Sequence, residues 1–177
     1  PIKSSAASVV YKRQVMKIET FTLRSNDTGG VAALRQVHPD CGGQNISPEL
    51  SWVNAPEGTR SFAITMYDKD APTGGGFWHW LMFDIPASVG ELRPDAGNIF
   101  GHLAPVSAVQ SLNDYGTYGY GGPNPPHGHG WHNYMITLYA LDIESLEMSK
   151  DTPPAQVGFK LWKHTLEKAS IVFYYRT

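Results

Sequence analysis

The sequence contains little of what marks several large classes of protein. Its single cysteine, Cys41, excludes an internal disulfide framework and favours a reducing compartment, the cytoplasm, with the periplasm or secretion left open. No apolar run approaches the roughly 20 residues that a transmembrane helix requires. Only 17% of the residues are charged and the formal net charge is −2, so no basic surface indicates a nucleic-acid partner. Residues 1–15 are predicted as a flexible extension or a cloning remnant, and residues 16–177 as a single domain.

Motifs for nucleophilic or nucleotide chemistry are also missing. The sequence has no G-x-S-x-G elbow, and Cys41 has His38 nearby but no recognisable group to orient it. The glycine-rich stretch "GTYGYGGPN" (116–124) fits neither a P-loop nor a dinucleotide fingerprint. We therefore expect a protein that is not an enzyme and that uses no cofactor.

Glycine and proline are abundant, with 18 and 13 copies, and they divide the chain into short runs. Most of these runs alternate with period two and are rich in β-branched and aromatic residues. Six are predicted as strands: 17–23, 50–53, 61–68, 78–85, 133–141 and 170–175. In this prediction the strands come first along the chain and the helix comes late. This order favours an antiparallel β-sandwich over βαβ repeats. The long, weakly periodic stretch 86–130 is predicted as an ordered functional loop.

One segment, from about residue 153 to 168, is predicted as a helix. It follows a capping Asp151 or Thr152 and prolines that suit a first helical turn. Its apolar residues recur at helical spacing, and they are Val157, Leu161, Trp162 and Leu166.

Polar side chains continue the apolar faces of three predicted strands past the ends of those faces. They are Asp68 and Asp70 after the run 62–66, His79 before the run 81–85, and His132 and Tyr134 before the run 136–140. An ionisable group in register with a core face is unfavourable unless it finds partners. Three strands that end in this way therefore predict a shared polar pocket at one rim of the sandwich. The alternative is a set of unrelated loop residues, which is common at strand ends.

A metal site is a second interpretation of these residues. Oxygen and imidazole ligands from Asp68, Asp70 and the histidines of 122–134 would suit a divalent cation. However, Pro72 stands where an EF-hand needs its third oxygen, and the histidines fit no tetrahedral zinc signature. No metal is therefore expected, and a hydrolase or metal-dependent enzyme that uses the Asp and His residues remains the alternative function.

Two motifs at a defined spacing make the sequence similar to a known family. "DKDAP" (68–72) precedes "WHW" (78–80), and "PPHGHGWHNY" (125–134) follows about fifty residues later. Together they resemble the phosphatidylethanolamine-binding protein family, also called the Raf-kinase-inhibitor family, in its bacterial type. Further text shared with the family is "NISPELSW" (45–52) and "NDYG" (113–116), and the resemblance extends from residue 16 essentially to the C-terminus.

The resemblance implies a Greek-key β-sandwich whose small rim pocket binds phosphate, phosphorylated head groups or similar anions. The family's pocket residues correspond here to Asp68, Asp70, His79, Pro125, Pro126, His132 and Tyr134. Strand parity places the same acids, histidines and tyrosine at one rim, and the prolines would form its lip. His127 and His129 are then expected on the solvent side, and the Ala71–Pro72 bond is expected to be cis.

The resemblance also implies a role and a set of partners. The family's best-known members are not enzymes, so we expect regulation of a kinase or protease, through inhibition or scaffolding. The expected small-molecule partner is an anion or a phospholipid head group, and a homodimer is one option. If His79 and His132 donate as imidazolium ions, the affinity for the anion should fall as the pH rises through about 6–8.

Three positions depart from the family pattern. Lys69 replaces a proline between the two acids, and Asn133 replaces an arginine between His132 and Tyr134. Asn124 occupies a position of the lip where a small residue is usual. These departures concern the choice of ligand and not the fold.

Overall fold

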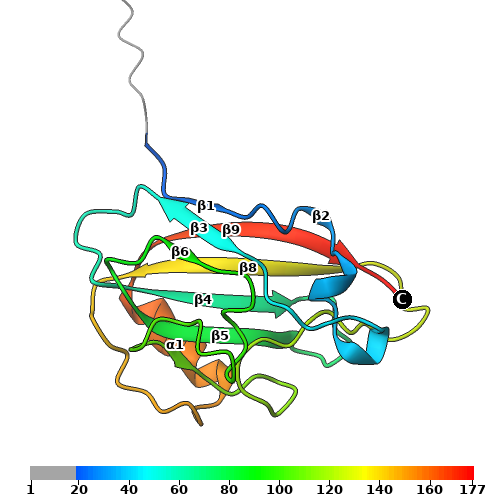
Figure 1. Ribbon diagram of the computed structural model, residues 1–177. Coiled ribbons are helices and arrows are strands. Elements are labelled where there is room, and N and C mark those ends of the chain that lie inside the picture. Colours follow the sequence, from blue (N-terminus) through cyan, green and yellow to red (C-terminus); the bar gives the residue numbers. More distant parts are fainter. Residues whose placement is uncertain (1–18) are drawn as a thin grey trace, which may run out of the picture.

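The computed structural model describes residues 19–177, which form two packed β-sheets and one α-helix (Figure 1). The small sheet has the strand order β1 (Thr22–Arg24), β3 (Leu50–Val53) and β6 (Glu91–Leu92). The large sheet has the order β2 (Gly30–Val31), β9 (Thr165–Tyr175), β8 (His132–Leu141), β4 (Ser61–Asp68), β5 (Phe77–Pro86) and β7 (Val109–Gln110). Two 3₁₀ turns, Leu34–Gln36 and Pro39–Cys41, follow β2. The mainly β sandwich is therefore confirmed, and the parallel pairing of the two-residue β2 with β9 is its only departure from antiparallel pairing among the described strands.

The main core lies between the two sheets. Trp52 of β3 and Phe62 of β4 meet edge to face, with ring centroids 5.3 Å apart. Alternate residues of β8, from Tyr134 to Ala140, face this core because side chains alternate along a strand. The parity expected for β4 and β8 is thus confirmed, and it aims the ends of both strands at the same edge of the core.

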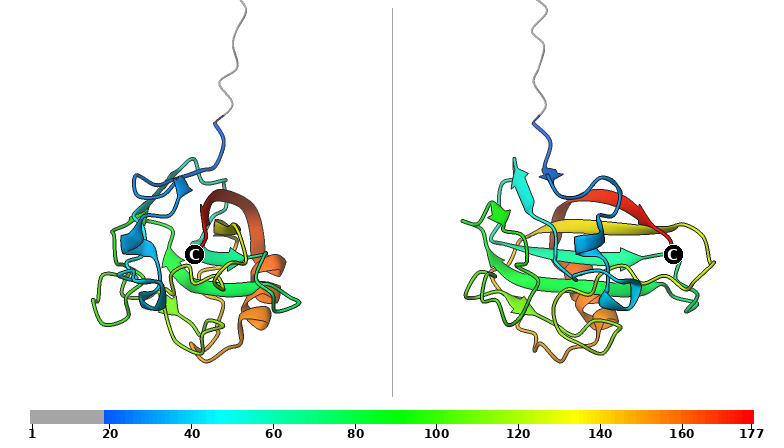
Figure 2. Two further views of the ribbon diagram at one scale, coloured as in Figure 1. Left: turned by 90° about the vertical axis from the view of Figure 1, so that its right-hand side faces the viewer. Right: turned by 45° about the vertical axis from the view of Figure 1, so that its right-hand side comes forward.

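A second core lies on the other face of the large sheet, under α1 (Pro154–His164). Val157 and Leu161 of the helix pack there against Ala63 of β4 and Leu81 of β5. The end-on view in Figure 2 shows α1 and the N-terminal strands on opposite sides of the large sheet. The central strand β4 is therefore buried on both faces.

The helix is shorter than the sequence predicts. It ends at His164, and Thr165 begins β9, which pairs with Leu141 of β8. Val157 and Leu161 are buried as expected, but Trp162 is 69% exposed and Leu166, which lies in β9, is 45% exposed. The prediction that residues 165–168 are helical was wrong because pairing with β8 outweighs a local pattern that suits either structure.

Two bulges in β5 change the direction of its side chains. Met66 pairs with Trp80 and Tyr67 with Trp78, so His79 is an extra residue on β5. A second register shift lies between the pair Phe62–Ile85 and the pair Ile64–Met82. Asp84, whose φ is 58°, lies at this shift.

The expected common face of Leu81, Phe83 and Ile85 is consequently wrong. Ile85 lies in the core between the sheets, whereas Leu81 and Phe83 lie in the core under α1. The first bulge also turns His79 to the side of Trp80 and away from Leu81, because one inserted residue reverses the parity of a strand.

Three smaller expectations complete the comparison. Residues 1–15, predicted as an extension, lie outside the described residues. The Ala71–Pro72 bond is trans, so the expected cis bond was wrong. Within residues 19–177, no helix combines the length and the apolar character that crossing a bilayer requires.

Candidate ligand-binding site

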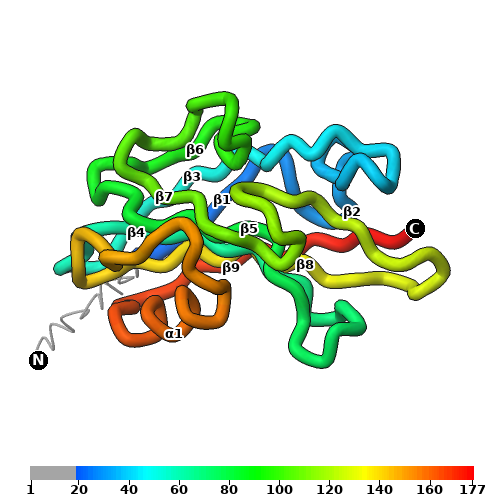
Figure 3. The backbone as a smooth tube through the Cα atoms, turned by 90° about the horizontal axis from the view of Figure 1, so that it is seen from below, coloured from blue at the N-terminus to red at the C-terminus, as the bar shows by residue number. Residues whose placement is uncertain are grey.

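A cavity of about 200 Å³ lies where β4, β5 and β8 end. Figure 3 shows three loops gathered near this end and the C-terminus: the one after β4, the one before β8 and the 3₁₀ turns near residue 40. Side chains from all three strands and from two loops line the cavity, among them Asp68, His79, Tyr115, Pro125, Pro126 and His132. Of the residues that the sequence predicts for a rim pocket, the structure thus brings Asp68, His79, Pro125, Pro126 and His132 to this cavity and leaves Asp70 and Tyr134 outside its lining.

A chain of hydrogen bonds runs along one wall of the cavity. The Asp68 carboxylate Oδ2 accepts a hydrogen bond from His132 Nδ1 at 2.7 Å, and both side chains are almost fully buried. The second oxygen, Oδ1, accepts from the backbone N–H of Asp70 at 2.8 Å. On the other side of the imidazole, His132 Nε2 lies 2.7 Å from Nδ1 of His129. His129 was expected as a solvent-side residue, and although it is exposed, it is the partner of a pocket histidine.

His79 forms the opposite wall. Its Nδ1 lies 2.9 Å from the carbonyl oxygen of Gly121, so Nδ1 carries the proton and donates it. Burial lowers the pKa of His79 to about 4, and this effect outweighs the carbonyl contacts and the charge of Asp68, which act in the other direction. His79 is therefore neutral near pH 7, and the expected imidazolium at this position is wrong because burial disfavours the charged form.

Tyr134 lies behind the cavity and does not line it. Its ring packs edge-on against His79, with ring centroids 5.1 Å apart, and it is fully buried. Its hydroxyl lies beside the Asp68 carboxylate without the geometry of a hydrogen bond and has no other partner among the described residues. Burial, and then the charge of Asp68, raise the pKa of the phenol. The hydroxyl therefore stays protonated, beside the Asp68 carboxylate.

Asp70 does not line the cavity. Its carboxylate accepts hydrogen bonds from the backbone N–H and the side-chain amide of Asn133 and forms an ion pair with Lys69, N to O 3.4 Å. Burial alone would raise the pKa of Asp70, but the bonds from Asn133 and the charge of Lys69 lower it. Asp70 thus ties the end of β4 to the start of β8, which positions Asp68 and His132.

The proline lip closes the cavity on one side. Pro125 is buried, Pro126 is exposed, and both line the cavity. Asn124 lines it as well, and its Oδ1 accepts a hydrogen bond from the Cys41 thiol, S to O 3.0 Å. The lip is thereby held to the 3₁₀ turn that contains Cys41.

Tyr115 is one of the lining residues that strand periodicity missed, as are Ala71, Pro72, Thr73 and Phe77. Its hydroxyl donates to the carbonyl oxygen of Gly122, and its ring stacks on His38 and meets His79 edge-on. A Cβ on Gly121 would lie 2.5 Å from this ring, so the close packing requires glycine there. Tyr115 lies in the loop region 86–130, where no period exists to place it, and the shared text "NDYG" was the only available signal.

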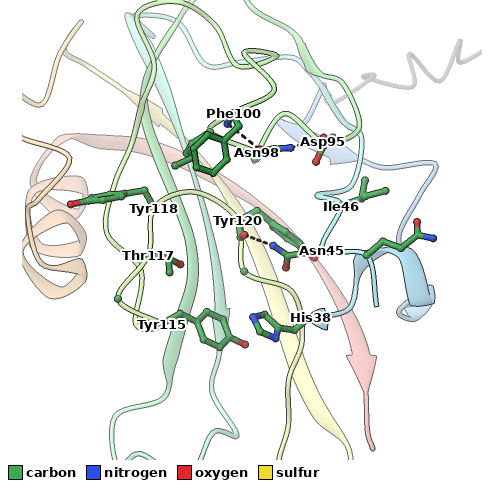
Figure 4. A pocket seen from close by; sticks show the side chains of 15 residues that line it. His38, Asn45, Ile46, Asp95, Asn98, Phe100, Tyr115, Thr117, Tyr118 and Tyr120 are labelled. Atoms are coloured by element: carbon green, nitrogen blue, oxygen red, sulfur yellow. Dashed lines mark hydrogen bonds between the residues drawn. The ribbon is translucent and has the colours of Figure 1, made fainter. Parts of the chain in front are cut away.

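The Tyr115 ring also borders a second, larger hollow of about 650 Å³ (Figure 4). Figure 4 shows His38 and Tyr115 side by side at one end of this hollow and Phe100 at the other. Tyr115 lines both the hollow and the smaller cavity, whereas His38 lines the hollow alone. The polar groups that line the hollow are largely engaged with one another, as in the bonds from the Asn45 amide to the Tyr120 carbonyl and from the Asn98 amide to Asp95.

Comparison with known proteins identifies the family. The family model for the phosphatidylethanolamine-binding protein matches residues 24–176. The chain belongs to this family. The chain is 45% identical over 131 residues to the protein YbcL of Escherichia coli, covering 74% of this chain and 72% of YbcL. It is 44% identical over 130 residues to YbhB of the same organism, covering 73% of this chain and 80% of YbhB.

Two further comparisons concern structure and naming. The crystal structure of YbcL, described as a member of the mammalian family, matches with a TM-score of 0.86 and covers 89% of this chain and 98% of that one. A protein of Mycobacterium tuberculosis that is named as a lipoprotein, LppC, is 33% identical over 130 residues, covering 73% of this chain and 58% of its own length.

Within this member of the phosphatidylethanolamine-binding protein family, the three departures from the family pattern acquire local roles. Lys69 and Asn133 both contact Asp70, and Asn124 contacts Cys41. None of the three adds a cation to the cavity lining, since the Lys69 amine is turned to Asp70 and its side chain is 66% exposed. Among the described residues, no three His, Cys, Asp or Glu side chains converge as metal ligands would.

Proposed function

We propose that this protein binds a small oxyanion, such as phosphate or a phosphorylated head group, in the cavity at the end of β4, β5 and β8. The observation that carries this proposal is the convergence of Asp68, His79 and His132 from three neighbouring strands on one small cavity. Pockets of this kind, with a few fixed polar groups and rigid walls, bind small ligands.

The donor that lines the cavity is His132, and Tyr134, whose ring packs against His79, supports the wall from behind. Because its Nδ1–H is given to Asp68, His132 can donate from Nε2 only as an imidazolium, once His129 gives up its contact. Asp68 holds His132 in a fixed orientation, as carboxylates commonly do for functional imidazoles.

The proposed role is regulatory and non-enzymatic, and the cytoplasm is the proposed compartment. A kinase or a protease is the proposed protein partner, because the family resemblance includes inhibitors. The same fold occurs in the carboxypeptidase Y inhibitor, solved with its cognate proteinase, although its 18% identity to this chain supports the fold alone. The single cysteine favours the cytoplasm, and the relative named as a lipoprotein makes cell fractionation the deciding measurement.

A hydrolase is the second candidate, and the hydrogen-bonded chain Asp68–His132–His129 is the observation that favours it. A carboxylate that orients an imidazole is also the arrangement of a general base. A hydrolase of this kind would need His132 Nε2 to be free in the bound state.

Calorimetric titration with phosphate and with phosphoethanolamine, alongside an assay for release of phosphate, separates these functions. Binding without turnover supports the proposed function. Turnover that disappears in His132→Asn supports the hydrolase. Absence of binding for both ligands refutes the oxyanion pocket.

A further inference from the structure

The charge of the cavity lining is unusual for a site that binds anions. The lining residues, all of them described, include no lysine and no arginine, and they include one carboxylate, that of Asp68. The cation nearest in sequence, Lys69, points to Asp70, which lies outside the lining. A doubly charged phosphate would therefore meet a negative charge and no permanent positive charge in a partly buried space, which is unfavourable.

His79 adds an acceptor to this lining. Its Nδ1–H is used by the Gly121 carbonyl, so in the neutral ring Nε2 carries a lone pair. A neutral imidazole with this tautomer accepts at Nε2 and cannot donate there. An oxyanion without a proton would place its own lone pair against that of Nε2.

The groups that surround His79 keep this arrangement fixed at neutral pH. From β4 it faces Asp68, from β8 Tyr134, and from the loop after β7 the ring of Tyr115, behind which His38 is stacked. Burial is the largest influence and lowers the pKa of His79 to about 4, whereas the Gly121 carbonyl and then the charge of Asp68 act in the other direction. The phenols of Tyr115 and Tyr134 have raised pKa values and stay uncharged.

We infer that the cavity selects an oxyanion that still carries one proton, such as the singly charged form of a phosphate monoester, whose P–O–H group donates to Nε2 of His79. This inference rests on the proposed function and specifies the chemical class of its ligand. It also changes the reason for the pH dependence expected from the sequence, because the proton that matters belongs to the ligand and not to His79.

Three small probes test the inference with the full-length protein. Methyl phosphate is a monoester whose second pKa lies near 6, so its singly charged form is lost above that pH. A fluorinated methylphosphonate loses the same proton at a lower pH. Dimethyl phosphate carries one negative charge at every pH used and has no proton to donate.

We expect the affinity for methyl phosphate, measured by calorimetry from pH 5 to 8.5, to be highest at low pH and then to fall about tenfold per pH unit above the second pKa of the ligand. The same fall for the fluorinated phosphonate should begin at a lower pH, displaced by the difference between the two ligand pKa values. Dimethyl phosphate should bind at least tenfold more weakly than methyl phosphate at pH 5.5.

A variant supplies an independent readout. In His79→Asn, the amide nitrogen can keep the bond to the Gly121 carbonyl, while the acceptor at Nε2 is removed. We expect this variant to lose the preference for methyl phosphate over dimethyl phosphate, whereas His127→Ala, a change at an exposed residue of the lip loop, should keep it. If His79→Asn fails to fold, ¹⁵N NMR of labelled histidine in the wild type gives the same information, since the Nε2 resonance of His79 should shift with methyl phosphate and not with dimethyl phosphate.

Each outcome separates this inference from the proposed function. Equal binding of dimethyl phosphate, or a fall in affinity at the same pH for both titrating ligands, would overturn the inference and leave the oxyanion pocket intact. A result of no binding for any probe at any pH would refute the proposed function, and the inference with it.

Discussion

The two ends of the large sheet are built on opposite principles. At one end, Val157 and Leu161 of α1 cover an apolar face and form a core whose fully buried members are all apolar. At the other end, the same strands terminate in Asp68 and His132, which are as deeply buried as the apolar residues. Apolar contact stabilises the first end without directional requirements, whereas the second depends on individual hydrogen bonds.

The difference shows how one strand can serve both purposes. Leu138 of β8 lies in the main core, and six residues earlier on the same face lies His132, which is oriented by Asp68. Rigid strands hold a polar site more precisely than a loop does. Stability and ligand binding should therefore respond to different substitutions, and four predictions test this separation.

The largest effect is expected at the helix-covered end. Leu161→Ala should lower the free energy of unfolding by about 2–5 kcal/mol, because it leaves a void among buried apolar groups. The affinity for phosphate should stay unchanged. The matched control is Trp162→Ala, which alters a side chain that is 69% exposed and should change the stability by less than about 0.5 kcal/mol. Chemical denaturation measures both, and a loss of binding in Leu161→Ala at temperatures where it is folded would contradict the separation of the two ends.

The next effect concerns acid stability at the pocket end. The pKa of His79 is about 4 in the folded protein, below its ordinary value of 6.5. Above pH 6.5 the imidazole is neutral in both states and contributes nothing; as the pH falls from 6.5 to 4, the unfolded state gains a proton that the folded state does not. The folded state should therefore lose up to about 3 kcal/mol over this interval through His79 alone.

Denaturant unfolding at several pH values, compared between wild type and His79→Asn, isolates this contribution. The variant should show a smaller fall in stability between pH 6.5 and 5, whatever its stability at neutral pH. Parallel pH profiles for the two proteins would show that His79 is not held neutral by burial.

The fold could be predicted from the sequence wherever one face of a strand is buried. The run 61–68 is β4 with the predicted bounds, because alternation and flanking turns both mark it. The end of the helix could not be predicted, since Thr165 and Leu166 suit a helix or a strand and only pairing with β8 decides between them. The bulges of β5 could not be predicted either, because an inserted residue leaves no trace in the alternation until its partner strand is known.

The candidate site, like the fold, could be predicted where the alternation of a strand is regular and not elsewhere. Asp68 and His132 meet because the parity of β4 and β8 is regular up to their ends. His79 reaches the cavity, but through a bulge and not through the parity that led us to expect it there. Asp70 lies outside the cavity because the amide of Asn133 competes for its carboxylate, and His129 is part of the site because a turn in the lip returns it to His132. Contacts of this kind depend on tertiary structure and cannot be inferred from spacing.

A smaller effect, on binding rather than stability, is expected for His132. In His132→Asn the amide nitrogen can keep the bond to Asp68, so the buried carboxylate retains a partner, whereas alanine would leave it unpaired. Loss of the donor at Nε2 should weaken phosphate binding by about 1.5–3 kcal/mol, the range for a hydrogen bond to a charged group. Calorimetric titration of folded protein gives the value, and an unchanged affinity would remove His132 from the ligand site.

The smallest effect, and the most specific, is expected for His129. In the structure its Nδ1 lies 2.7 Å from Nε2 of His132, so an oxyanion that uses His132 must first displace it. His129→Ala removes this competitor and should raise the affinity for phosphate by roughly two- to tenfold, which corresponds to one hydrogen bond of about 0.5–1.5 kcal/mol. The matched control is His127→Ala in the same exposed turn, which should leave the affinity unchanged. A weaker affinity in His129→Ala would instead mean that His129 contacts the ligand, and the competition between the two histidines would be refuted.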